Sequence, residues 1–149
     1  MITIAFKGYA GFWKRLAAAI IDGMIVIGLA MILKSFFLPA PAEGGEELFA
    51  PAEVIKNLST FSLILLFSSW IYYGFMESSS GQATLGKMTL GIKVIDRSGK
   101  RISFFRATGR YWGKFLSTFP FFIGFLMIAF SGRKQALHDK ISGCLVVNG

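Results

Sequence analysis

The sequence contains few of the residues that build reactive centres. Its 149 residues include one cysteine, Cys144, and one histidine, His138. A single cysteine excludes an intramolecular disulfide and a metal site made of clustered cysteines. His138 is followed by Asp139 but has no second histidine to join it, and no serine lies in a recognisable nucleophile elbow. We therefore expect a protein that is not an enzyme, has no metal site and uses no cofactor.

Apolar residues dominate what is present. Hydrophobic residues make up 54% of the chain, and its mean hydropathy is positive. These values predict that residues 1–149 form one small membrane-embedded domain. Crossing a hydrocarbon core of about 30 Å takes roughly 20 apolar residues, so the stretches at about 12–33 and 58–76 predict two full transmembrane helices. The first does not resemble a cleaved signal, because its apolar run is too long, contains Asp22 and is followed by Lys34.

Charge is distributed unevenly between the connecting segments. Residues 35–56 hold four glutamates and only one basic residue, whereas residues 77–114 hold eight basic and two acidic residues. Positive charge favours the cytoplasmic side, which predicts a cytoplasmic N-terminus, an external acidic loop at 35–56 and a basic cytoplasmic segment at 77–114. Topology and anionic lipid headgroups explain the basic character, so no nucleic-acid partner is expected.

The third apolar segment, 115–130, is short for a membrane span and is interrupted by Pro120 and Gly124. A crossing would place the basic residues of 131–149 outside, against the bias that orients the first two helices. We favour a broken or re-entrant segment packed against the two helices, which leaves 131–149 cytoplasmic. A single tilted crossing is the alternative. The predicted fold class is thus an all-α membrane protein with two transmembrane helices and this embedded segment.

The segment between the second helix and residue 115 has a different pattern. Alternating apolar residues on either side of the turn-like sequence 96–99 predict a small cytoplasmic β-hairpin. Ser103 then suits the start of a helix on which Arg106, Arg110 and Lys114 recur every four residues. We interpret these three as a basic stripe facing the lipid headgroups, with a substrate-binding role as the alternative.

Asp22 is the most informative residue within the apolar stretches. A carboxylate at that depth is costly in lipid and needs a partner, and Arg15 lies seven positions earlier on nearly the same helix face. On the second helix four polar residues share one face, which indicates interhelical hydrogen bonding or a polar wall opposite Asp22. They are Ser62, Ser69, Tyr73 and Glu77.

Residues 81–88 come close to the phosphate-binding loop of nucleotide hydrolases. That loop needs Ser or Thr after its lysine and a preceding strand, whereas here Met88 follows Lys87 and a membrane helix precedes the segment. We interpret its glycines as allowing a tight turn and close backbone approach where the chain leaves the membrane.

Three separated blocks of sequence resemble the RDD family of small membrane proteins. The family is named for an arginine at the start of the first membrane helix, an aspartate in its middle and an aspartate near the C-terminus. Arg15 and Asp22 in residues 11–22, and Asp139 in residues 133–140, stand at those positions, and Thr84–Lys87 and Gly91–Val94 resemble the family's middle segment. The resemblance implies a membrane location, expected here to be the bacterial cytoplasmic (inner) membrane. It also implies a role in transport, since cation/proton exchange has been suggested for some members.

Two classes of function follow. In the first, Asp22 is a titrating carboxylate in proton-coupled transport of an ion or solute such as a monovalent cation, Arg15 tunes its charge and Asp139 forms a cytoplasmic gate. Two or three helices cannot easily enclose a pathway, so this function requires a homo-oligomer or a larger complex. In the second, the same three residues form a structural lock in which Arg15 pairs with Asp139, and the protein is an accessory or assembly subunit of a larger membrane complex.

Overall fold

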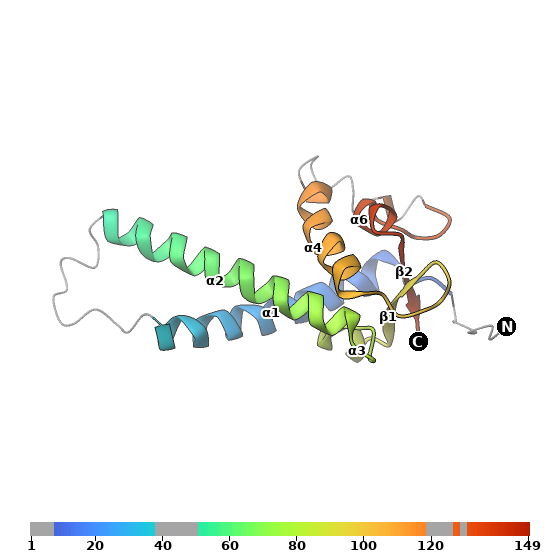
Figure 1. Ribbon diagram of the computed structural model, residues 1–149, viewed down its shortest axis with the longest axis horizontal. Coiled ribbons are helices and arrows are strands. Elements are labelled where there is room, and N and C mark those ends of the chain that lie inside the picture. Colours follow the sequence, from blue (N-terminus) through green and yellow to red (C-terminus); the bar gives the residue numbers. More distant parts are fainter. Residues whose placement is uncertain (1–7, 38–50, 119–126, 129–130) are drawn as a thin grey trace.

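The computed structural model describes residues 8–37, 51–118, 127–128 and 131–149. Two long helices, α1 (Phe12–Phe37) and α2 (Pro51–Ser78), lie side by side, and the shorter elements gather near the end where α1 begins and α2 ends (Figure 1). We call this group of shorter elements the cap. It consists of α3 (Leu85–Thr89), β1 (Ile92–Asp96), α4 (Phe104–Thr118), α6 (Leu137–Ile141) and β2 (Cys144–Asn148).

Helix α1 buries one narrow stripe of its surface. Its buried residues are spaced four apart, which places them on the side that faces the rest of the chain. They are Ala18, Asp22, Val26 and Ala30. Large apolar residues such as Ile20, Met24 and Met31 are exposed on the other sides. A helix that is apolar almost all round and buried on one stripe suits a lipid environment, with small residues where a neighbour approaches.

Both long helices exceed the length needed to span a bilayer. α1 has 26 residues and α2 has 28, which correspond to about 39 and 42 Å, and both are apolar enough to cross. The predicted loop at 35–56 is too long at both ends, because α1 runs to Phe37 and α2 starts at Pro51. Proline suits the first helical position, and Glu53 in the first turn interacts favourably with the helix dipole.

The small sheet pairs the two ends of the cap. β1 and β2 are antiparallel, with Val94 opposite Val146. The prediction of a local β-hairpin across the 96–99 turn is therefore wrong: β1 pairs with β2, and the segment after the turn is not a strand. The physical reason is apolar burial, since Cys144 and Val146 contribute to the same buried cluster as Ile92 and Val94. The segment 100–103 offers one buried apolar side chain, Ile102.

The chain entering α1 runs beside the sheet. The Ala10 backbone N–H donates to the Val146 carbonyl at 2.9 Å, and the Asn148 N–H donates to the Gly8 carbonyl at 2.9 Å. Residues 8 and 148 therefore lie at the same end of the molecule. Most of the predicted re-entrant segment, 119–126 and 129–130, lies outside the described residues, but α4 continues to Thr118 and packs against α6.

Helix α4 crosses close to α2. A Cβ atom added at Gly74 would lie 2.8 Å from the Phe104 ring, so the glycine allows this approach. Ser103 caps α4 as predicted, because its hydroxyl accepts the Arg106 backbone N–H at 3.3 Å. This contact holds the C-terminal end of α2 against the cap.

Candidate functional site

Asp22 is fully buried where α1 meets α2 and α3. The Tyr72 hydroxyl on α2 and the Gly86 backbone N–H on α3 each donate to its Oδ1 atom at 2.8 Å. The Thr84 hydroxyl donates to Oδ2 at 2.6 Å. The carboxylate thus receives three donors and joins α1 to α2 and to the start of α3.

Residue 86 is required to be glycine by this arrangement. A Cβ atom there would lie 2.4 Å from the Ala18 carbonyl oxygen and 2.9 Å from the Asp22 carboxylate. The N–H of Gly86 belongs to the first turn of α3, where backbone donors have no partner within the helix. The close approach therefore allows an acidic side chain of α1 to satisfy the start of α3.

A second group of buried side chains, which we call the charge network, lies at the same end of the helices. It consists of Arg15, Glu77, Lys87, Arg110 and Asp139. Arg110 on α4 is its centre: Nη1 lies 2.6 Å from Glu77 Oε2, and Nε lies 2.7 Å from Asp139 Oδ1. Arg15 binds Asp139 Oδ2 at 2.5 Å, and Lys87 binds Glu77 Oε1. Cations and anions therefore alternate from α1 through α6, α4 and α2 to α3.

Burial of these side chains makes the loss of any one ion pair costly for stability. The side chains of Glu77, Arg110 and Asp139 are each at most 3% exposed. Removing one member of a buried ion pair typically costs about 3–5 kcal/mol, because the remaining charge is left without compensation. The network therefore holds five elements in one arrangement.

The charges within the cap shift one another's protonation. Burial would lower the pKa of Arg110, but the carboxylates of Glu77 and Asp139 raise it above its ordinary value. Burial would raise the pKa of Asp139, but Arg110, His138 and Arg15 together lower it well below its usual range. For Lys87 burial outweighs the attraction of Glu77, and its pKa is lowered. Arg110 and Asp139 are thus held in their charged forms.

Two further titratable groups of the cap border the network. Burial lowers the pKa of His138 to about 3 despite the neighbouring Asp139 carboxylate. Burial also lowers the pKa of Lys114 to about 7, although Glu77 opposes this effect. The Lys114 Nζ atom lies 3.6 Å from the centre of the Tyr73 ring, a position typical of a cation–π interaction.

The predicted polar face of α2 does not form a wall opposite Asp22. Ser69 bonds the Tyr111 hydroxyl of α4 at 2.6 Å, Tyr73 lies beneath Lys114 of α4, and Glu77 binds Arg110. Ser62 donates to the Leu58 carbonyl within its own helix. From Ser69 to Glu77 this face is directed toward α4, and Asp22 contacts α2 through Tyr72.

The predicted basic stripe on α4 is also incorrect as a headgroup-facing surface. Arg106 is exposed, but Arg110 is buried in the charge network and Lys114 is half-buried over Tyr73. Four-residue spacing places the three on one face of the helix. Near Arg106 this face is exposed, whereas at Arg110 and Lys114 other elements of the protein cover it. The buried carboxylates of Glu77 and Asp139 explain why Arg110 is drawn inward.

The structure confirms the predicted pair of Arg15 with Asp139 and separates Asp22 from Arg15. Arg15 binds Asp139 and the backbone carbonyls of Ala10 and Lys134. Sequence pattern alone does not identify Thr84 and Gly86 as partners of Asp22. Their signal is the middle segment at 84–87, whose polar and small residues follow shortly after the second membrane helix.

The side chains that the structure describes contain no group of three or more histidine, cysteine or acidic residues able to hold a metal ion. Within the same residues no buried side-chain nitrogen or oxygen is without a hydrogen-bond partner. The chemistry of the site is that of a fully bonded ionic and polar network.

Comparison with known proteins identifies relatives along most of the chain. The RDD family model matches residues 9–143. The uncharacterized protein YxaI of Bacillus subtilis (strain 168) is 40% identical over 147 residues, covering 93% of this chain and 96% of the relative. The uncharacterized membrane protein YteJ of the same organism is 31% identical over 149 residues, covering 94% and 81%. No solved structure matches the chain.

Proposed function

Because this chain belongs to the RDD family and is a membrane protein, we propose that it serves as a non-catalytic accessory or assembly subunit of a larger membrane complex. One observation carries the proposal. Among the residues that the structure describes, the three buried carboxylates, Asp22, Glu77 and Asp139, have both oxygens bound by donors from this same chain.

A carboxylate that carries ions must exchange its partners for the transported ion. Here each exchange would break contacts between elements of the fold: Asp22 joins α1 to α2 and α3, and Asp139 joins α6 to α1 and α4. Interhelical hydrogen bonds in membranes contribute about 0.6–2 kcal/mol each, and buried ion pairs cost more to break. The arrangement favours a fixed scaffold over a cycling site.

A scaffold of this kind presents its apolar helices to its surroundings. Exposed large apolar residues cover the outer sides of α1 and α2, where lipid or another membrane protein would contact them. Examples are Leu16, Ile20, Ile27, Leu63 and Phe67. We place the cap on the cytoplasmic side of the inner membrane because of its basic charge, next to anionic headgroups.

Site-specific photo-cross-linking in native membranes tests this function. A photoreactive residue at Phe67, on the exposed side of α2, should give a discrete adduct with a different membrane protein. The matched control is Phe105, which is 85% exposed on the cap and should give no such adduct. Cross-linking at Phe67 only to lipid or to a second copy of the chain, in membranes where the protein is at its natural level, would contradict the proposal.

Transport is the second candidate. Asp22 is fully buried within a candidate membrane span and is bonded to two hydroxyl groups, from Tyr72 and Thr84, which are able to pass protons. Ionisable residues at such positions are often functional. In this function an oligomer exchanges protons for a monovalent cation with Asp22 as the titrating group, and Asp22→Asn abolishes the exchange. Proton flux in reconstituted vesicles is the test.

A further inference from the structure

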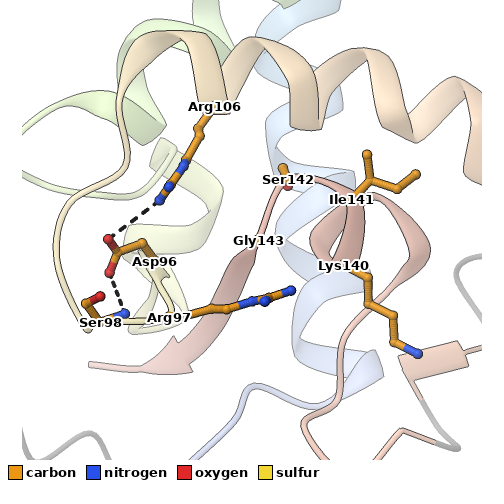
Figure 2. A pocket seen from close by; sticks show the side chains of 8 residues that line it. All are labelled: Asp96, Arg97, Ser98, Arg106, Lys140, Ile141, Ser142 and Gly143. Carbon is orange, nitrogen blue, oxygen red and sulfur yellow. Dashed lines mark hydrogen bonds and ion pairs between the residues drawn. The ribbon is translucent and has the colours of Figure 1, made fainter.

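The cap contains a pocket that no residue of the charge network lines. Its volume is about 510 Å³, and three segments distant in sequence line it: the turn after β1, the first turn of α4 and the end of α6. Figure 2 shows Arg106 extending from α4 toward Asp96 and Arg97 extending from the turn toward α6, with Lys140 on the far rim, its ammonium group directed away from the other two. The lining of the pocket therefore includes three cationic side chains.

The positive charge of the pocket is only partly compensated within the protein. Asp96 is its single acidic residue, and its Oδ1 atom accepts the backbone N–H groups of Ser98 and Lys100 at 2.8 Å each. Its Oδ2 atom lies 3.6 Å from the exposed Arg106 guanidinium, a loose ion pair. Among the described residues, neither Arg97 nor Lys140 has an acidic partner.

The backbone around the pocket positions these cations. Gly143 has a φ of +65°, and a Cβ atom there would lie 3.9 Å from Arg97 Nε, so the guanidinium group lies against the turn that ends α6. Arg106 stands in the first turn of α4, where the helix dipole disfavours a cation. An anion bound beside Arg106 would remove this conflict.

We propose that this pocket binds the phosphate group of a phosphate monoester. At neutral pH such a group carries nearly two negative charges and three acceptor oxygens, which match two guanidinium groups and an ammonium group. The group belongs either to a soluble molecule such as glycerol 3-phosphate or to the headgroup of phosphatidic acid. The proposal does not depend on whether the protein is an assembly subunit or a transporter.

The test compares two double variants with the same change of charge. Arg97→Gln with Lys140→Gln removes two cations from the pocket. Lys100→Gln with Arg101→Gln removes two exposed cations nearby that do not line it. Glycerol 3-phosphate binding is measured by calorimetry on the full chain in neutral-lipid nanodiscs, and phosphatidic acid binding by native mass spectrometry of the full chain in nanodiscs containing that lipid. Thermal unfolding verifies that both variants remain folded.

The pocket variant should bind one of the two probes at least about tenfold more weakly than the unchanged chain. The reason is that each lost hydrogen bond to a charged group raises the dissociation constant by about tenfold or more. Binding by the Lys100 and Arg101 variant should stay within about twofold of the unchanged chain. If the pocket variant loses affinity for soluble glycerol 3-phosphate, the ligand is a soluble molecule. If it loses affinity for phosphatidic acid alone, the ligand is a lipid headgroup. Equal losses in both variants, no binding of either probe, or equally tight binding of acetate would overturn the proposal.

Discussion

Replacing Arg110 with methionine should weaken the attachment of α4 and α6 to the end of α2. Methionine keeps much of the length of the side chain and favours a helix as well as arginine does. It removes the guanidinium group that bridges Glu77 and Asp139 at 2.6 and 2.7 Å. The substitution therefore tests the centre of the charge network with little change in helix propensity.

The expected loss follows from the partners that remain. Glu77 keeps Lys87, while Asp139 keeps Arg15 and the Ala136 backbone N–H. Each carboxylate thus loses part of its compensation, and we expect the free energy of unfolding to fall by about 3–5 kcal/mol. Arg110→Lys retains the charge but lacks the planar fork that reaches both carboxylates, so its loss should be smaller and still measurable.

The assay is unfolding in mixed micelles titrated with SDS, followed by tryptophan fluorescence in a background where Trp13 and Trp112 are replaced by phenylalanine. Trp70 on α2 donates to the Thr108 hydroxyl on α4 at 3.2 Å, so its emission reports separation of these helices. Arg106→Met is the matched control, because Arg106 lies one turn earlier with a side chain that is 52% exposed. It should cost at most about 1 kcal/mol. An equal loss for both variants would refute the role assigned to Arg110.

Three further predictions concern the cap and the topology. Gly86→Ala should destabilise by about 1–3 kcal/mol because its Cβ would overlap the Ala18 carbonyl, whereas Gly109→Ala, which meets no atom within 4 Å, should be neutral or stabilising; thermal unfolding of both variants distinguishes them. Stability should fall as pH drops from about 6.5 toward 4.5, because the unfolded chain takes up a proton on His138 whose pKa in the folded chain is lowered to about 3; His138→Gln should remove this slope in unfolding measured against pH, and an unchanged slope would exclude His138 as its source. A cysteine introduced at Gly149 should react with a membrane-impermeant reagent only from the cytoplasmic side; labelling from outside would reverse the predicted topology.

The sequence predicted the elements that depend on local pattern. Two apolar stretches of sufficient length gave the two long helices, and Ser103 marked the start of α4. The pairing of Arg15 with Asp139 was predictable because each charge borders apolar residues and needs a partner. These inferences depend on properties that neighbouring residues reveal without a three-dimensional arrangement.

The pairing of strands that lie far apart in the sequence is the main feature that the local pattern does not predict. Alternating apolar residues identify β1 as a strand, but alternation does not state which strand lies beside it, and the partner β2 begins at Cys144. The tight turn at 96–99 favours the nearest partner in sequence, the segment that follows the turn. Burial of Val146 against the cluster containing Ile92 decides the actual partner.

The partners of buried charges were likewise beyond local reasoning. Glu77 at the end of an apolar helix requires a cation, yet eight basic residues follow within 77–114. Helical spacing placed Arg110 on a basic face but could not show that α2 and α6 cover that face. The contacts of Asp22 with Thr84 and Gly86 depend on α3 folding back against α1.

Proton flux in vesicles distinguishes the structural role that we propose for Asp22 from ion transport. The chain is reconstituted into liposomes with an internal pH indicator, and Na⁺, K⁺ and Li⁺ gradients are applied in turn to it and to Asp22→Asn. The variant should fold, because an amide oxygen can accept the N–H of Gly86 while its NH₂ group donates to the Thr84 hydroxyl. If Asp22 has only a structural role, neither protein should give cation-dependent flux above that of protein-free vesicles. Flux through the unchanged chain that disappears in a folded Asp22→Asn variant would contradict this role and establish the transport function.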